Sequence, residues 1–364
     1  MRAISDPKGI SEIEEELDAF IIKNSRNPFM LSVFIKGMME STLLKDSIPM
    51  VLVLMTDGKI IGVAPLLLRK KFGIRSATLL FNSWLSPDFI FDTEHNEVCM
   101  QNSLTYIFGH LKCQSAALDL PGEPLNLHIL ERICETNRIY LHKKNGASLN
   151  HCIIPVESTW DDFQKLRGYD FRKKFKKIER HLGRAGQWQI LLFENENNEQ
   201  DVFRKIMSVE EASWKQNWRF QHRTLVDEDL LKIWEGSSLA IRTCPDFKRS
   251  VWFLELNDQA IAYHLVIQYK GTAYMVKTSY NNQYRKFGPG IYTTNVAIHD
   301  LFNCGRIKII DFMTNLPFMK TWTSRHLLRF RLLLWKGFLP NLFELTIQLP
   351  QIRKIMWRIG RKIP

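Results

Sequence analysis

The chain has 364 residues, of which 45% are hydrophobic and 24% are charged, so disorder over most of its length is excluded. This length exceeds the size at which a single hydrophobic core usually stops growing, and two domains are expected. The formal net charge of +12 favours an anionic partner, which could be a nucleic acid, a membrane surface or an anionic co-substrate.

The six cysteines are scattered, and no two of them form a Cys-x-x-Cys pair. This spacing argues against a zinc site and a disulfide framework, and it is typical of small buried side chains in a reducing compartment. The N-terminal residues lack the apolar core of a secretory signal, and no run of 18 uncharged apolar residues occurs. We therefore expect a cytoplasmic protein without a membrane-spanning helix.

In chain order, the first half opens with two predicted helices at about 9–23 and 29–42, separated by Asn27-Pro28. Residues 50–68 read as a β-hairpin with its turn at Asp57-Gly58. Short strands are predicted at 79–81, 88–91, 116–120, 139–142 and 152–155, with helices at 95–111 and 124–136. Residues 1–155 are expected to form the first domain.

The second half opens with predicted helices at 159–181 and 198–217. The first of them carries a cluster of basic residues: Arg172, Lys173, Lys174, Lys176, Lys177 and Arg180. Strands follow at 251–256, 260–268 and 272–280, and then a loop at 285–290, a helix at 291–302 and a strand at 307–312. An antiparallel meander followed by one crossover helix predicts a mixed sheet.

The first half shows a similar order without a glycine loop. The expected fold class is therefore α+β (mixed α/β), with tandem domains at 1–155 and 156–322, each a mostly antiparallel mixed sheet flanked by helices.

Residues 323–364 are expected to form a basic amphipathic C-terminal helical tail. From Thr321 to Pro364 nine Lys and Arg residues stand against one acid, and Ile352, Ile355, Met356 and Ile359 recur at helical spacing. A basic amphipathic helix is predicted within 340–364. It would either dock on the second domain or lie on an anionic membrane surface, which would make the protein membrane-peripheral.

The most informative motif is Arg285-x-x-Gly288-x-Gly290, between a predicted strand and a predicted helix. Glycines let the backbone turn tightly and approach a ligand, and the helix that follows begins with unpaired N–H groups and a partial positive charge. Such a loop is suited to a pyrophosphate. The alternative is an ordinary strand-to-helix turn punctuated by Gly288-Pro289-Gly290.

This loop resembles the acyl-CoA signature of the GNAT N-acyltransferase superfamily. Further features resemble its double-domain, Fem-like branch and the acetyltransferases encoded with cellulose and exopolysaccharide genes: Asn27-Pro-Phe29, Gly62-Val-Ala-Pro65-Leu66, Ser213-Trp214-Lys215, Tyr280, Pro289-Gly290-Ile291, Asp311 and Lys320. The resemblance covers roughly residues 27–322. The glycine that relatives commonly carry after the aspartate is missing after Asp311, and the expected aromatic-Lys pair is Met319-Lys320.

The resemblance implies acyl-CoA, in particular acetyl-CoA, as co-substrate, and no metal. Its pyrophosphate would lie on Arg285, Lys286, Phe287, Gly288, Gly290 and Ile291. Attack of an amine on a thioester needs a proton acceptor, a group that polarises the carbonyl and an acid for the thiolate.

Three residues are candidates for these catalytic roles. Asp311 would take the amine proton or simply cap a turn. Tyr280 would donate to the thiolate or merely end a strand, and His264 would act as a base or as a hydrogen-bonded core histidine. Trp214, Lys215 and Lys320 are candidate substrate-binding residues, with core packing or solvation as their alternatives.

Taken together, the sequence predicts an acyl-CoA-dependent N-acyltransferase. By analogy its acceptor would be an amino sugar or another amine of envelope or exopolysaccharide synthesis. One alternative is a Fem-like aminoacyl-tRNA-dependent transferase whose RNA surface is the basic helix within 167–184. The other is a non-catalytic double domain that binds a partner or a membrane. DNA is not an expected partner.

Overall fold

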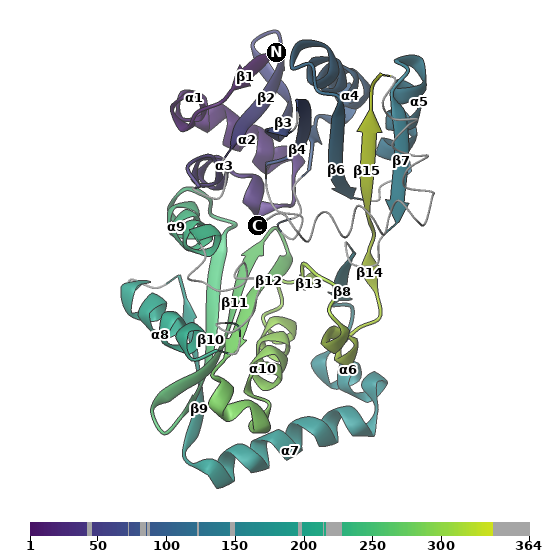
Figure 1. Ribbon diagram of the computed structural model, residues 1–364. Coiled ribbons are helices and arrows are strands. Elements are labelled where there is room, and N and C mark those ends of the chain that lie inside the picture. The colour runs from purple at the N-terminus through teal and green to yellow at the C-terminus, as the bar shows by residue number, and fades with distance from the viewer. Residues whose placement is uncertain are drawn as a thin grey trace.

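The computed structural model describes residues 1–41, 46–71, 73–80, 85, 88–121, 124–145, 150–195, 199–213, 215 and 228–337. Trp214 and the predicted tail helix at 340–364 lie outside these residues. Two mixed sheets flanked by helices make up the fold, which confirms the predicted class (Figure 1).

The first half of the chain alternates short helices with strands. Its elements are β1 (Arg2–Ile4), α1 (Pro7–Ser11), α2 (Glu14–Asn24), α3 (Ser32–Met39), β2 (Ser47–Thr56), β3 (Lys59–Lys71), β4 (Ile74–Leu79), β5 (Ile90–Phe91), α4 (Asn96–Thr105), β6 (Ser115–Pro121), α5 (Pro124–Thr136), β7 (Tyr140–Asn145) and β8 (His151–Pro155). The predicted hairpin is β2 and β3, which pair in register from Ser47–Arg69 to Thr56–Lys59.

The second half contains the predicted meander. Its elements are α6 (Trp160–Arg167), α7 (Tyr169–Ala185), β9 (Trp188–Glu194), α8 (Glu199–Glu211), α9 (Glu228–Thr243), β10 (Lys248–Leu256), β11 (Gln259–Tyr269), β12 (Thr272–Tyr280), α10 (Pro289–Asn303), β13 (Ile309–Asp311), β14 (His326–Leu327) and β15 (Arg329–Trp335). The single helix predicted at 159–181 is broken at Gly168, whose φ of +84° favours glycine.

Both sheets have the same plan. The first runs β1-β2-β3-β4-β6-β15-β7, and the second runs β9-β10-β11-β12-β13-β8-β14. In each sheet the fourth and fifth strands are parallel, β4 with β6 and β12 with β13, while the other neighbours are antiparallel. The similar order of elements predicted for the two halves therefore corresponds to the same strand order and direction in the two sheets.

The sixth position of each sheet is filled by a strand from outside its own half. β15 lies between β6 and β7 in the first sheet, and β8 lies between β13 and β14 in the second. The boundaries predicted at residues 155 and 322 do not match this pairing, because β8 belongs to the second sheet and β15 to the first.

The expectation of a helical tail from residue 323 is also wrong over the described part, since β15 is a strand. Its pattern fits a strand because Leu332 and Leu334 are buried on one face. On the other face, Arg331 forms a bidentate ion pair with Asp119 of β6, at 2.6 and 2.7 Å. Arg331 would interrupt the apolar face of a helix, but in the strand it pairs with a residue of the neighbouring strand.

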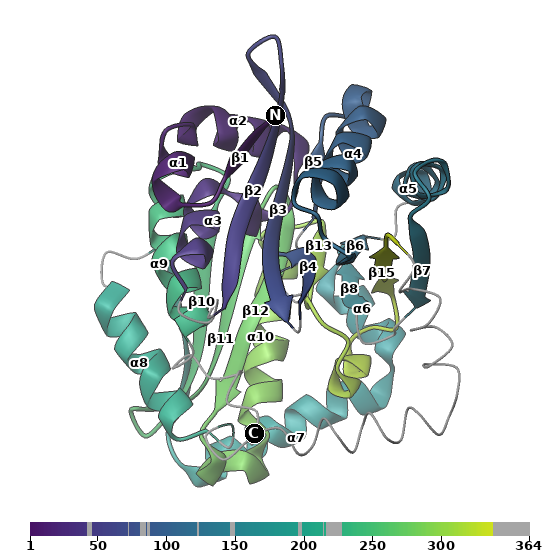
Figure 2. The same cartoon turned by 45° about the horizontal axis from the view of Figure 1, so that its top comes forward.

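One hydrophobic core is shared by the two halves. It packs α1, α2 and α3 of the first half against α8, α9 and the meander strands of the second, and Figure 2 shows these helices along one side of both sheets. The opposite face of the second sheet is covered by α6, α7 and α10, and that of the first by α4 and α5. The meander is therefore enclosed on both faces.

Most of the cysteines are buried, as the sequence predicted. Cys99, Cys113, Cys134, Cys152 and Cys244 are buried free cysteines, whereas Cys304 is exposed. No helix among the described residues combines the length and the apolar character needed to cross a bilayer.

Candidate active site

The parallel strands β12 and β13 share only a short ladder. Pairing covers Thr272–Tyr274 with Ile309–Asp311, after which β13 ends and β12 continues to Tyr280. A register shift against β11 leaves Val276 as an extra residue, which is a bulge in β12. Bulges re-aim side chains and are frequent beside active sites. The last residues of β12 therefore form an irregular strand edge without a ladder on the β13 side.

The predicted glycine loop directly follows this edge. It contains a 3-10 helix, Asn282–Phe287, and then Gly288, whose φ of +65° is left-handed and which is the N-cap of α10. Among the described residues no side chain caps α10, so its first N–H groups have neither an intrahelical partner nor a described side-chain partner. The structure thus places a free helix N-terminus, with its partial positive charge, at the end of β12.

Gly290 is required by a close approach. A Cβ at this position would lie 2.9 Å from Cδ1 of Tyr280, which is below any normal contact distance. The absence of a side chain lets the first turn of α10 lie directly on the Tyr280 ring. The motif glycines therefore have separate tasks, since Gly288 turns the chain and Gly290 permits the packing.

Positive charge is available at the loop. Arg285 and Lys286 are exposed on the 3-10 helix, while Phe287 and Ile291 are partly buried against the core of the second sheet. Helix α7 crosses this region, because Ile178 lies 3.4 Å from the Cβ position of Gly288. In Figure 1, α7 spans the end of the second sheet below α10.

His264 and Tyr280 share the sheet face that α10 covers. His264 on β11 pairs with Thr278, and Tyr280 pairs with Ala262, so the two side chains are neighbours on adjacent strands. Thr294 donates to the carbonyl of Gly290, and its oxygen accepts a hydrogen bond from Nδ1 of His264 at 3.0 Å. The Nε2 atom of His264 is buried and has no hydrogen-bond partner.

Burial, with the positive charge of Lys215 as a smaller cause, lowers the pKa of His264 to about 3. The imidazole is therefore neutral at physiological pH. Nδ1 carries the proton, and Nε2 presents a lone pair.

Asp311 lies on the opposite face of the sheet. Its neighbours Ile310 and Phe312 belong to the core under α10, so strand alternation directs Asp311 the other way. Its carboxylate accepts from Nδ1 of His151 at 3.1 Å and from the backbone N–H of Met313 at 2.6 Å. The structure thus brings Tyr280 and His264 together, but it holds Asp311 apart from them, in a buried hydrogen bond with His151.

A polar cluster on the same side as Asp311 was not assigned from the sequence. Glu210 of α8 is fully buried, and its Oε1 accepts from the hydroxyl of Tyr263 at 2.5 Å. Lys215 lies 3.8 Å from the same oxygen and donates to the carbonyl of Thr278 at 2.6 Å. Lys215, a predicted substrate-binding residue, is therefore bound to the irregular edge of β12.

A signal for this cluster exists in the sequence. Val202, Ile206 and Val209 form the buried face of α8, and Glu210 continues that face as a fully buried carboxylate. A charged residue at a core-facing helical position needs a polar partner. Tyr263 supplies it from a strand more than 50 residues away, and for that reason the pair was missed.

Lys320 is exposed on a 3-10 helix, Pro317–Thr321, that follows β13. Thr321 accepts a hydrogen bond from Lys174 of α7 at 3.3 Å. Lys320 is thus on the α7 side of the second sheet. Trp214 lies outside the described residues.

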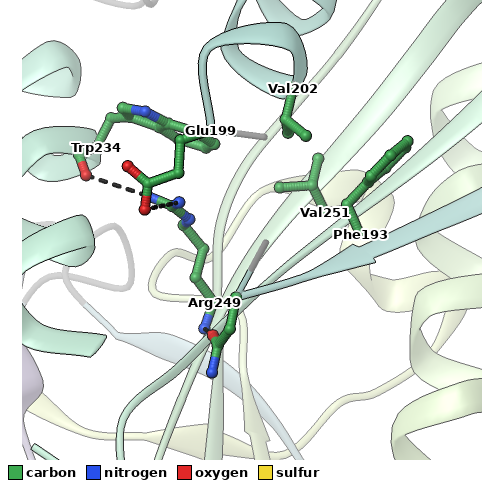
Figure 3. A pocket seen from close by; sticks show the side chains of 7 residues that line it. Phe193, Glu199, Val202, Trp234, Arg249 and Val251 are labelled. Atoms are coloured by element: carbon green, nitrogen blue, oxygen red, sulfur yellow. Dashed lines mark hydrogen bonds and ion pairs between the residues drawn. The ribbon is translucent and has the colours of Figure 1, made fainter. Parts of the chain in front are cut away.

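Figure 3 shows a small cavity beside β10, away from the glycine loop. Its volume is about 10 Å³, which is enough for one water molecule. Arg249 fills the space beside it, with its guanidinium 3.7 Å from the ring centre of Trp234 and 3.1 Å from Glu199. This arrangement joins α8, α9 and β10, and it serves packing rather than ligand binding. Among the described residues no group of three or more His, Cys, Asp or Glu is arranged to hold a metal ion.

Comparisons with known proteins agree with the fold described above. Residues 170–318 match the model of the acetyltransferase (GNAT) domain family. No curated protein matches the chain significantly.

Solved structures with a similar fold extend over nearly the whole chain. The chain is similar to FemX, with a TM-score of 0.60, 12% identity and coverage of 96% of this chain and 100% of that one. It is also similar to a conserved protein of unknown function from Bacteroides thetaiotaomicron, with a TM-score of 0.54, 11% identity and coverage of 89% and 97%.

A third similar structure is the C-terminal domain of a protein assigned as a lysylphosphatidylglycerol synthetase from Agrobacterium fabrum. Its TM-score is 0.51, with 10% identity and coverage of 90% and 92%. Residues 170–318 therefore match the GNAT domain family, and the chain as a whole shares its fold with FemX.

Proposed function

We propose that the protein is an acyl-CoA-dependent N-acyltransferase that transfers an acyl group, in particular acetyl, to an amine. One observation carries this proposal: the glycine loop presents the uncapped N-terminus of α10 at the point where β12 continues beyond β13. A helix N-terminus binds a pyrophosphate, and a strand edge with irregular pairing offers hydrogen bonds to an extended thioester arm.

The residues of the loop fit an anionic group. The first N–H groups of α10, from Gly290 and Ile291, would bind the pyrophosphate, and Arg285 and Lys286 would add mobile positive charge. Phe287 would support the loop by packing against the core. No metal is needed for this chemistry.

The acyl transfer can be written with Tyr280 as the proton carrier. The amine nitrogen attacks the thioester carbonyl carbon, and the carbon–sulfur bond breaks. The Tyr280 hydroxyl gives its proton to the leaving sulfur and then receives the proton released by the amine, so that charge and protons balance. His264 would hold α10 beside Tyr280 through its hydrogen bond to Thr294 and would not act as the base, because it is buried and its pKa is lowered to about 3.

The remaining candidates act on other sides of the site. Lys215, held against β12, and Lys320 would contact the acceptor. Asp311, occupied by His151, would support β13 from the opposite face. By analogy the acceptor is an amino sugar or another amine of envelope or exopolysaccharide synthesis.

The test is calorimetric titration with acetyl-CoA, longer acyl-CoAs and pantetheine. Arg285→Ala with Lys286→Ala should weaken acetyl-CoA binding about tenfold or more, since each lost charge-assisted contact costs about 1.5–3 kcal/mol. Arg69→Ala with Lys70→Ala, another exposed adjacent pair, is the matched control and should bind like the native chain. Equal binding by both double variants would contradict the proposal.

Tyr280 is tested by kinetics. Tyr280→Phe keeps the ring that packs on Gly290 and should lower kcat by about 100-fold or more, with KM nearly unchanged. An unchanged kcat would remove Tyr280 from the proton path.

A second candidate function is aminoacyl transfer from tRNA, which is supported by the likeness to the FemX fold and by the basic outer face of α7. It predicts that charged tRNA binds where acyl-CoA does not. If neither binds, the non-catalytic alternative gains support.

A further inference from the structure

The corner between α6 and α7 exposes two large apolar side chains. Leu166 is 83% exposed and Tyr169 is 68% exposed, more than any other large hydrophobic residue among the described ones. They flank Gly168, which ends α6 and begins α7. Leu166 lies two residues before Gly168, and Tyr169 lies one residue after it. Because both side chains are accessible to water, they do not contribute to the core, and their joint exposure marks a candidate contact surface.

Positive charge surrounds this corner. Helix α7 carries seven Lys and Arg residues against two acids, and all seven are exposed: Arg172, Lys173, Lys174, Lys176, Lys177, Arg180 and Arg184. Nζ of Lys173 lies 5.5 Å from the ring of Tyr169, so the charge begins at the apolar tip itself. Arg167 lies behind it, and burial, with the nearby cation of Arg325 as a smaller cause, lowers the pKa of the Arg167 guanidinium.

Most nearby acids are already engaged. Asp162 is 3.2 Å from Lys165, Glu157 is 3.2 Å from Arg325, and Glu179 accepts from the Tyr292 hydroxyl at 3.1 Å. Asp161 and Asp170 are exposed beside the tip. Together with Glu179, whose charge the neutral Tyr292 hydroxyl does not cancel, they offset three of the seven charges, which leaves an excess of four positive charges.

The corner is also rigidly mounted. The inner face of α7 buries Phe171, Phe175 and Leu182 in the core of the second sheet. The basic face of the helix is thereby fixed outward, and the tip cannot fold back to hide Leu166. An apolar tip with a fixed basic surround has the composition of an interfacial membrane anchor.

We propose that the α6–α7 corner docks on an anionic lipid surface, with Leu166 and Tyr169 inserted among the headgroups and the basic residues of α7 facing the lipid phosphates. A nucleic acid would use the charges but would leave Leu166 in water, because an aliphatic side chain gains nothing from a sugar–phosphate backbone. The surface is formed by described residues of α6 and α7 and does not depend on the proposed acyl transfer. It would bring the Arg285–Gly290 loop, which α7 crosses, close to the lipid.

The experiment is sedimentation of the full chain with phosphatidylcholine vesicles, with or without phosphatidylglycerol. We expect binding to the anionic vesicles alone, weakened by salt. Leu166→Ser with Tyr169→Ser should reduce the partition coefficient about tenfold or more, since both side chains lose apolar burial. Leu239→Ser, at a 53% exposed position on α9, is the matched control and should sediment like the native chain.

A second variant tests the charge without touching the tip. Lys173→Glu, Lys176→Glu and Lys177→Glu together should abolish sedimentation, while circular dichroism confirms the fold. The proposal is overturned if the native chain ignores anionic vesicles, or if the Leu166 and Tyr169 variant sediments unchanged. Binding of tRNA that the charge variant loses and the tip variant keeps, without vesicle binding, would reassign α7 to RNA.

Discussion

At the scale of single residues, His264 shows how burial sets a protonation state. Its pKa is lowered to about 3 because α10 seals it from water, and Thr294 fixes which nitrogen carries the proton. In the unfolded chain the same group titrates near pH 6.5. Between these two values the unfolded state binds a proton that the folded state does not, so folding stability rises with pH across this window.

We therefore expect His264 to contribute to acid sensitivity. Lowering the pH from 7 to 5 should cost about 2 kcal/mol at this position, because each pH unit below 6.5 costs about 1.4 kcal/mol. His264→Asn keeps a donor toward Thr294 and cannot titrate, so its loss between pH 7 and 5 should be smaller. Urea unfolding at the two pH values measures this, and an equal loss in both proteins would contradict the assignment.

The sequence predicted residues best where local chain geometry decides their role. Gly288 and Gly290 were identified because a strand, a tight turn and a helix follow one another in the chain. The pairs His151–Asp311 and Tyr263–Glu210 join residues 160 and 53 positions apart, and no local pattern encodes such a meeting. Asp311 was therefore expected at the chemistry, while the structure gives it another partner.

At the scale of elements, the crossing of α3 and α9 depends on a close approach. A Cβ on Gly236 would lie 2.8 Å from Cδ1 of Phe34, and Gly37 of α3 faces Lys232 of α9. Phe34 is buried in the core that both halves share. This crossing therefore links the two halves through van der Waals contact between the glycine of one helix and side chains of the other.

Gly236→Ala should destabilise the protein by about 1–3 kcal/mol, because the added methyl overpacks the crossing by more than helix propensity returns. Gly109→Ala is the matched control, since nothing lies within 4 Å of its Cβ position and its φ is not left-handed. In denaturant unfolding the midpoint should be lower for Gly236→Ala than for the native chain. The midpoint of Gly109→Ala should not be lowered. A stabilised Gly236 variant would show that the helices separate freely.

Elements were predicted well when their neighbours in the sheet are also neighbours in the chain. The meander β10 to β12 and the hairpin β2–β3 have that property. β15 was not predicted because its partner strands lie about 200 residues earlier in the chain. Its arginines are also typical of a basic helix, and only the structure shows that Arg331 pairs with Asp119. β9, an edge strand without a buried residue, and α9 were also missed.

At the scale of the whole molecule, the exchange of β8 and β15 ties the two sheets together. Neither half of the chain contains every strand of its own sheet. The two topological repeats are therefore expected to form one cooperative unit.

Calorimetry should accordingly give one unfolding transition, with equal calorimetric and van't Hoff enthalpies. Leu334→Ala truncates a fully buried side chain of β15. It should lower the free energy of unfolding by about 2–5 kcal/mol, and the unfolding should remain a single transition. Leu239→Ala, at an exposed position, should leave it in place. Two transitions, of which one moves, would indicate independent domains.

The exchanged strand also sets the order of events during synthesis. A ribosome makes β6 and β7 early, yet the strand that belongs between them is among the last described residues to be translated. Until Trp335 leaves the exit tunnel, β6 and β7 each have an edge with unpaired backbone N–H and C=O groups. Such edges can pair with other extended chains and promote aggregation. The N-terminal sheet therefore becomes complete only after β15 has been made, and a premature stop codon before β15 would release a chain with an open sheet.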